Sequence, residues 1–194
     1  MIIGDPGVFA VESQMTSAYE RPSLRGLGYF VIHINSIEYG VRSADATMLA
    51  SSFDSVERRI AARGTHSALL LENEQNAGTI ADAILGSVYA PDQDYKGVFG
   101  VPRTELSNLL HSNALIWAPD GDEAFDDGSH VVQFDARDRV RLIGFKSRDG
   151  YRHEPGSLSD IWISADAFYG ILARWHQAFE DEWIAALKTP EPSR

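Results

Sequence analysis

LGYFVIHIN, residues 27–35, is the strongest strand pattern in the sequence. It is rich in β-branched and aromatic residues, which favour β-strands. The pair Asn35-Ser36 that ends it suits a tight turn, and Ile37–Val41 then has the composition of a partner strand. A loosely alternating segment, Val8–Met15, precedes both and reads as a third strand. Together these segments predict an antiparallel sheet built around an early hairpin.

A helix is predicted to follow this sheet. Asp45 is a good N-cap for a helix that runs to about Arg63, and Gly64 stands where a C-terminal capping glycine belongs. Apolar residues recur at helical spacing along this segment, at Leu49, Phe53, Val56 and Ile60. Each of these side chains contributes roughly 1.5–3 kcal/mol if it is buried in a core.

The middle of the chain reads as short elements separated by loops. His66–Leu71 resembles a short strand, and Thr79–Val88 has the periodicity of a second helix. Tyr89–Gly100 carries the proline, glycine and aspartate residues of a loop, and Pro102–Ser112 is predicted to be a third, short helix.

The last third of the chain completes the fold class. Ser129–Asp135 and Arg139–Lys146 read as two strands joined by a turn, and Asp160–Ile163 as another short strand. Ser164 is predicted to cap the longest helix, which runs to about Lys188. Strands that group early and late predict an α+β fold. We therefore expect a single domain over residues 1–188, mainly an antiparallel sheet with helices packed on it and a long C-terminal helix, followed by a flexible tail at 189–194.

Charge narrows the classes of partner. The chain has 28 acidic and 17 basic residues, a net charge of −11, and its two halves carry −5 and −6. An acidic surface throughout argues against binding nucleic acid or an anionic membrane, and it suits a cationic protein partner. The absence of cysteine excludes disulfides and thiolate chemistry. With no basic region followed by a long apolar one at the start, and no apolar run of roughly 20 residues, we expect a cytoplasmic protein.

Catalytic and nucleotide-binding motifs are absent from the sequence. Gly26-Leu27-Gly28 opens a strand instead of following one, and neither G-x-x-x-x-G-K nor G-x-S-x-G occurs. The six histidines form no H-E-x-x-H pair. His33 shares a strand face with Tyr29 and Val31, where a partly buried, hydrogen-bonded histidine is expected. We expect no enzyme activity, cofactor or metal.

The densest polar segment is residues 119–128, which contains five carboxylates and two glycines. It fails the EF-hand calcium pattern, because counting from Asp120 places Ala124 at position five and Val131 at position twelve. One interpretation is a solvated turn. Another is a negative patch for a basic partner, with Phe125 either an interface anchor or a core residue beneath the loop. The candidate partner-binding residues are Asp120, Asp122, Glu123, Phe125, Asp126, Asp127 and the loop residue Tyr151. An alternative is a carboxylate- or metal-dependent hydrolase that uses this loop with His130 or His153.

Two stretches resemble a known family. The opening MIIGDPGVFAV, residues 1–11, is similar to the start M-I-x-G-[DN]-x-x-x-F-A-[IV] of the Immunity protein 42 family of bacterial polymorphic toxin systems. EAFDDGS, residues 123–129, with the strands that follow it, resembles a later F-D-D segment and hairpin of that family. The C-terminal helix with Phe168, Leu172 and Trp175 is also similar, so the resemblance spans nearly the whole chain.

The resemblance implies a cytoplasmic antidote that acts by binding. Such a protein blocks the toxin domain of a secreted or contact-delivered effector, including effectors of contact-dependent inhibition and type VI secretion, and protects the producing cell and its kin. A basic toxin such as a nuclease would match the negative charge of this chain. A structural or regulatory protein that never meets a toxin remains a third hypothesis.

Overall fold

Residues 27–35 lie at the centre of the first of two antiparallel sheets, as the sequence predicts. The computed structural model describes residues 1–72, 74–91, 99–117, 123–148 and 151–190. In the N-terminal sheet, β3 pairs with β2 on one side and with β4 and β5 on the other, and β1 extends the sheet beyond β2. The strands are β1 (Ile2–Asp5), β2 (Phe9–Ala18), β3 (Gly26–Ile34), β4 (Ile37–Tyr39) and β5 (Thr47–Met48).

The second sheet is built on the predicted hairpin at 129–146. Its central strand β7 pairs with β6 on one side and with β8 and β9 on the other. These strands are β6 (Ser129–Ala136), β7 (Arg139–Arg148), β8 (Arg152–His153) and β9 (Ser159–Ser164).

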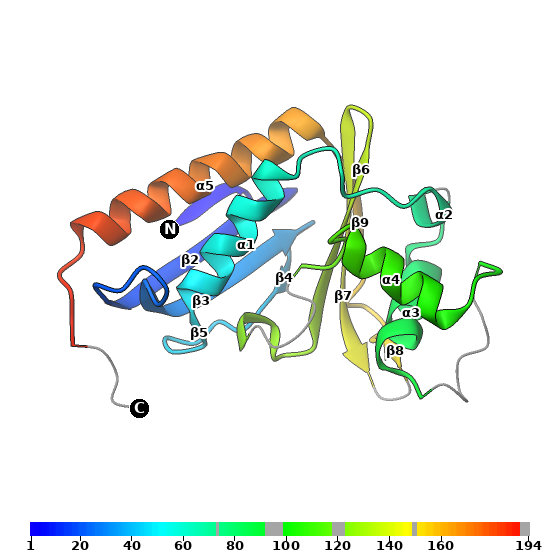
Figure 1. Ribbon diagram of the computed structural model, residues 1–194, viewed down its shortest axis with the longest axis horizontal. Coiled ribbons are helices and arrows are strands. Elements are labelled where there is room, and N and C mark those ends of the chain that lie inside the picture. The colour runs from blue at the N-terminus through cyan, green and yellow to red at the C-terminus, as the bar shows by residue number, and fades with distance from the viewer. Residues whose placement is uncertain (73, 92–98, 118–122, 149–150, 191–194) are drawn as a thin grey trace.

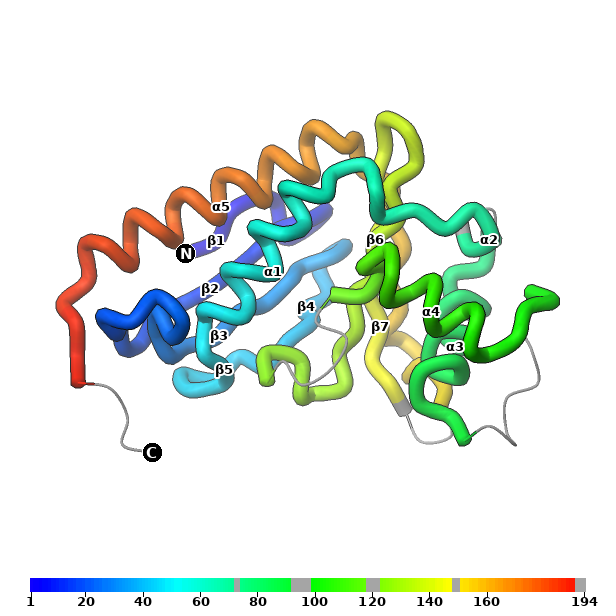
Figure 2. The backbone as a smooth tube through the Cα atoms, in the orientation of Figure 1, coloured from blue at the N-terminus to red at the C-terminus, as the bar shows by residue number. Residues whose placement is uncertain are grey.

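Helices lie in two separate groups. The described helices are α1 (Leu49–Ala61), α2 (Leu69–Glu72), α3 (Ala77–Tyr89), α4 (Arg103–Ser112), the short 3₁₀ helix η2 (Glu123–Phe125) and α5 (Ala165–Ala185). Figure 1 shows α1 and α5 side by side over the N-terminal sheet, and α2, α3 and α4 beyond the second sheet. The tube in Figure 2 shows the chain crossing from α1 to α2 between these two groups.

The second sheet is a middle layer that is buried on both faces. Val131, Val140 and Leu142 belong to the core shared with α1, α5 and the N-terminal sheet. Their neighbours Val132 and Ile143 belong to a second core shared with α3 and α4. Because successive side chains point to opposite faces of a strand, each of these strands contributes side chains to both cores.

The structure confirms the α+β class and its long C-terminal helix, with the strands divided between two sheets. Ser164 caps α5 as predicted, since its Oγ accepts a hydrogen bond from the Ala167 N–H at 3.2 Å. The helix ends at Ala185, slightly before the predicted end near Lys188. Thr189, the first residue of the predicted tail, donates its N–H to the Ala18 carbonyl of β2 at 2.7 Å.

Two local predictions are wrong. Asp45 does not cap α1, because Thr47 and Met48 pair with β3 as β5, and this extended backbone delays the helix to Leu49. His66–Leu71 is not a strand, because its second half forms the first turn of α2. Short apolar runs are compatible with a strand or with a buried helical turn. Leu71 is buried and Leu69 is exposed, so the two side chains point in different directions, as they do in a helix and not in a strand.

Tyr39 joins the two sheets. The ring of this last β4 residue lies directly over Gly144 of β7, so closely that a Cβ at Gly144 would come within 2.3 Å of the ring carbons Cε2 and Cζ. The hydroxyl donates a hydrogen bond to the Ser157 carbonyl at 2.8 Å, and burial raises the pKa of Tyr39 to about 12. Only glycine at position 144 leaves room for this contact.

A buried hydrogen-bond network ties helices of both ends of the chain to β6. Asp135 accepts a bond from the Tyr169 hydroxyl of α5 at 2.7 Å and from the Gln133 amide at 3.0 Å. Arg59 of α1 donates to the Gln133 side chain at 3.1 Å and to the Ile116 carbonyl at 2.7 Å. Burial lowers the pKa of Arg59 to about 9, so its guanidinium stays charged at pH 7. These buried hydrogen bonds connect α1 and α5 to one strand and favour one packing of the core.

Replacement of Gly144 by alanine tests the contact between the sheets. We expect Gly144→Ala to lower the free energy of unfolding by about 1–3 kcal/mol, because the added methyl group overlaps the Tyr39 ring. The matched control is Gly170→Ala in α5, where a Cβ meets only Arg174 Nη1 at 3.5 Å. Removing a helical glycine there should stabilise by up to about 1 kcal/mol. Urea unfolding that shows both variants equally stable would contradict this description of the junction.

Candidate functional site

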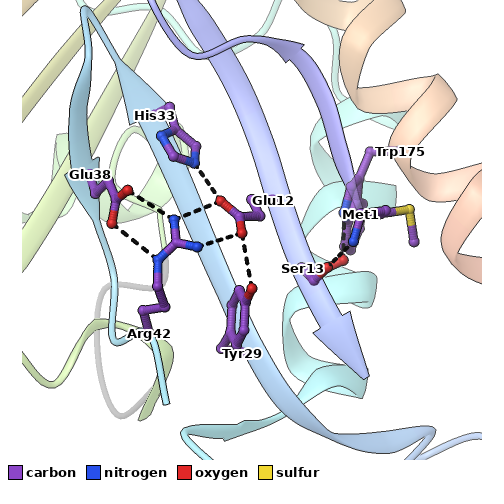
Figure 3. Close-up of polar contacts among 8 residues, drawn as sticks. All are labelled: Met1, Glu12, Ser13, Tyr29, His33, Glu38, Arg42 and Trp175. Atoms are coloured by element: carbon purple, nitrogen blue, oxygen red, sulfur yellow. Dashed lines mark hydrogen bonds and ion pairs between the residues drawn. The ribbon is translucent and has the colours of Figure 1, made fainter. Parts of the chain in front are cut away.

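A cluster of charged and polar side chains lies on the face of the N-terminal sheet opposite α1 and α5. Ser13 points towards α5, since its Oγ accepts a hydrogen bond from the Trp175 indole N–H at 3.0 Å. Successive side chains of a strand point to opposite faces, so Glu12 points away from the helices. Figure 3 shows Glu12 with Tyr29 and His33 of β3, Glu38 of β4 and Arg42, while Ser13 and Trp175 lie apart from this group. We call these five residues the Glu12 network.

Every oxygen of the Glu12 carboxylate has partners. Its Oε1 accepts hydrogen bonds from the Tyr29 hydroxyl at 2.9 Å and from Arg42 Nη1 at 2.6 Å. Its Oε2 accepts from Arg42 Nη2 at 2.7 Å and lies 2.8 Å from His33 Nε2. Arg42 therefore grips this carboxylate with two parallel bonds, the strongest geometry for such a pair.

Arg42 also binds a second carboxylate. Its Nη2 lies 2.9 Å from Glu38 Oε1, and its Nε lies 3.2 Å from Glu38 Oε2 (Figure 3). The guanidinium stands over the Tyr29 ring, with its central carbon 5.5 Å from the ring centroid. One cation thus bridges β2 and β4 across β3.

The network has an inner and an outer part. Glu12 and His33 are each only 5% exposed, whereas the side chains of Arg42 and Glu38 are 41% and 49% exposed. The exposed pair Arg42 and Glu38 therefore lies closer to solvent than the buried pair Glu12 and His33. A partner that docks on this face would meet Glu38 and Arg42 first.

Shifts in the pKa values of Glu12, Arg42 and Tyr29 indicate the charge of each group at neutral pH. Burial opposes ionisation of Glu12, but hydrogen bonds from Arg42, His33 and Tyr29 outweigh it and lower the Glu12 pKa. The Arg42 pKa is raised by its hydrogen bonds to Glu12. Burial and the bond to Glu12 raise the Tyr29 pKa, so its hydroxyl remains a donor. Two carboxylates thus share one guanidinium.

Most of the acidic residues singled out from the sequence lie in or beside the turn around η2. Glu123 and Asp126 are exposed, and Asp127 forms an ion pair with Lys146 at 2.6 Å. Asp120 and Asp122 lie outside the described residues. Phe125 is 8% exposed, and its ring centroid lies 6.3 Å from that of Phe30. Of the two roles that the sequence allowed, interface anchor or core residue, the structure shows the core residue.

This acidic turn and the Glu12 network are neighbours along one edge of the sheet. The Val41 N–H donates to the Ala124 carbonyl at 2.8 Å, and the Gly40 N–H donates to Ser129 Oγ at 3.1 Å. Figure 2 shows the η2 segment running beside β4 and β5. Tyr151 is 40% exposed in the turn between β7 and β8.

The two histidines considered for hydrolytic chemistry have separate structural partners. His130 stacks on Phe145 with centroids 5.1 Å apart, and burial lowers its pKa to about 4. His153 Nδ1 lies 2.7 Å from Asp82 Oδ1 of α3. In the part of the chain that the structure describes, no group of three or more histidine, cysteine, aspartate or glutamate residues is arranged to hold a metal ion.

One concave surface on the described part of the chain lies along α4 and is mainly apolar. A groove of about 270 Å³ runs along α4 and is lined by Leu70, Val101, Leu106 and Leu109, with Glu105, Asn108 and Ser112. No histidine lines it. Across the described ranges, no helix has the length and hydropathy of a membrane span.

The sequence suggested only part of this cluster. It placed Tyr29 and His33 on one strand face and predicted a partly buried, satisfied histidine, which the structure confirms. The pairing of Glu12 with Arg42 was missed, because 30 residues separate them and Arg42 lies beyond the end of β4. A glutamate at the centre of an apolar strand was the available indication of a buried charge pair.

Glu12→Gln tests whether this carboxylate is held ionised. At neutral pH we expect the variant to lose about 1–3 kcal/mol of unfolding free energy, because charged hydrogen bonds are broken. The folded pKa of Glu12 lies below its ordinary value of 4.5, so its contribution is complete above that value and disappears as pH falls through the folded pKa. The difference between wild type and variant should therefore shrink in acid. Urea unfolding across pH measures it, with Glu57→Gln on exposed α1 as control. A difference that is independent of pH would contradict the assignment.

Known proteins share the fold and the sequence family of this chain. It has the fold of CdiI from Burkholderia dolosa AUO158, whose crystal structure superposes with a TM-score of 0.56 at 14% sequence identity. The match covers 92% of this chain and 99% of that one. No curated protein matches the chain significantly. The family model for Immunity protein 42 matches residues 1–178, and the chain therefore belongs to the Immunity protein 42 family.

Proposed function

We propose that this chain is an antidote that binds a bacterial protein toxin and neutralises it. The observation that carries this proposal is membership of the Immunity protein 42 family over residues 1–178. The chain acts by occupying a surface of the toxin and not by a reaction of its own. The encounter takes place in the cytoplasm of the producing cell or its kin.

The likeness to CdiI supports a toxin delivered by contact between cells. CdiI shares this fold over nearly its whole length. We extend its role in contact-dependent inhibition to this chain as part of the proposal. The toxin itself would be the product of a neighbouring gene.

The toxin that fits best is cationic, such as a nuclease domain. A net charge of −11 produces a field that attracts a basic domain and repels nucleic acid. Complementary charges of this kind raise association rates towards ~10⁸ M⁻¹s⁻¹ at low salt. An interface of roughly 800 Å² on each partner is normal for such complexes.

The acid-rich turn is our proposed first contact. Glu123 and Asp126 are exposed beside the edge of the N-terminal sheet, and Asp120, Asp122 and Asp127 add to the charge in the sequence. Phe125 supports this turn from within the core, where its ring meets Phe30. Exposed Tyr151 is a further contact residue in the proposal.

Co-expression tests the function itself. Cells that express the toxin encoded beside this gene should stop growing, and this chain should restore growth and co-elute with the toxin on gel filtration. An unrelated protein of similar net charge is the control for a non-specific effect of charge. Absence of both rescue and complex would contradict the proposed function.

Charge removal tests the role of the turn. Replacing Asp120, Asp122, Glu123, Asp126 and Asp127 by serine or asparagine should slow association by about tenfold at low salt and flatten its salt dependence. The dissociation rate should change less, since exposed rim charges act mainly on the encounter. Stopped-flow mixing with inactivated toxin measures both. Unchanged association by a folded variant would place the interface elsewhere.

A further inference from the structure

We infer that the toxin docks on the face of the N-terminal sheet that the described helices leave uncovered, and that a lysine or arginine of the toxin joins Arg42 on the exposed carboxylate of Glu38. This inference rests on the proposed function and names the surface that performs it. The surface consists of the exposed residues Ile2, Gln14, Glu38 and Arg42 with the half-buried Tyr29, and Glu12 is buried among them.

The position of the face in the fold is the first argument. The sheet is covered by α1 and α5 on the side of Ser13, Phe30 and Trp175, which belong to or touch the core. On the other side, Arg42 lies against Glu12 and Glu38 and its side chain is 41% exposed. Ile2 of β1, the register partner of Glu12, is 50% exposed. The face therefore combines apolar, aromatic and charged groups that are accessible to a partner.

Charge complementarity selects the occupant. Two carboxylates share the single cation Arg42, and Glu38 is 49% exposed. The adjoining turn adds Glu123 and Asp126, while the Lys146 nearby is paired with Asp127. An anionic ligand or membrane would be repelled here, and a second copy of this chain would bring the same negative face. A cationic protein fits.

The side chain of Arg42 is already ordered in the free protein. Arg42 is held by both carboxylates and by the Tyr29 ring before any partner arrives. Ordering of long side chains usually costs about 0.5–1.5 kcal/mol for each residue on binding, and this cost is already met in the free protein. Arg42 is exposed and Tyr29 is half-buried, and arginine and tyrosine are enriched in interface hot spots.

Matched charge variants on the two faces test the inference. Glu38→Gln removes one charge from the uncovered face, and Glu57→Gln removes one from the outer side of α1. Gln14→Lys adds an opposing charge to the uncovered face beside Tyr29, its register partner. All three positions are exposed, so the variants should fold, and thermal unfolding verifies this. The probe is the catalytically inactivated toxin domain encoded by the adjacent gene.

We expect Glu38→Gln and Gln14→Lys each to weaken binding by about tenfold or more, while Glu57→Gln stays within about twofold of wild type. Binding by wild type with all three variants unaffected would overturn the docking face but leave the antidote function intact. Equal losses for Glu38→Gln and Glu57→Gln would show that net charge alone matters, which also overturns it. Failure of wild type to bind would remove the proposed function, and this inference with it.

Discussion

The two sheets meet where the Tyr39 ring packs against the backbone of Gly144, which has no side chain. This contact holds the end of β4 against β7 and so joins two sheets that have separate pairing partners. Gly40 and Val41 follow directly and bond to the segment at 124–129. Arg42 comes next and turns back over β3 to reach Glu12. The junction in the core therefore positions the charged face as well as the sheets.

In the docking proposal, the Glu12 network is a recognition surface that is organised by a buried carboxylate. Removing Glu12 from water is unfavourable, and the paired bonds from Arg42 together with Tyr29 and His33 compensate for it. The charged groups of the network bond to one another on the face of the sheet opposite α1 and α5. What it offers a partner is a fixed pattern of charge, which confers specificity and speed of encounter.

Regular elements of this fold were predictable from the sequence, and contacts between distant residues were not. LGYFVIHIN, the hairpin at 129–146 and the Ser164 cap carry local patterns that the structure confirms. The predictions at Asp45 and His66–Leu71 were wrong, because contacts with residues distant in the sequence determine β5 and α2. The contact between the two sheets depends on Gly144, and the candidate face depends on Arg42, and both roles arise only from packing. The family resemblance came from short motifs at both ends, and the family match confirms it.

Carboxylate footprinting of the complex tests the central claim most directly. The free protein and its complex with inactivated toxin would be labelled with a carbodiimide and an amine, and modification of each glutamate and aspartate would be read by mass spectrometry. The account predicts that labelling of Glu38 and Glu123 falls in the complex while that of Glu57 and Asp54 on α1 is unchanged. Protection of Glu57 and Asp54, with Glu38 still fully labelled, would contradict it.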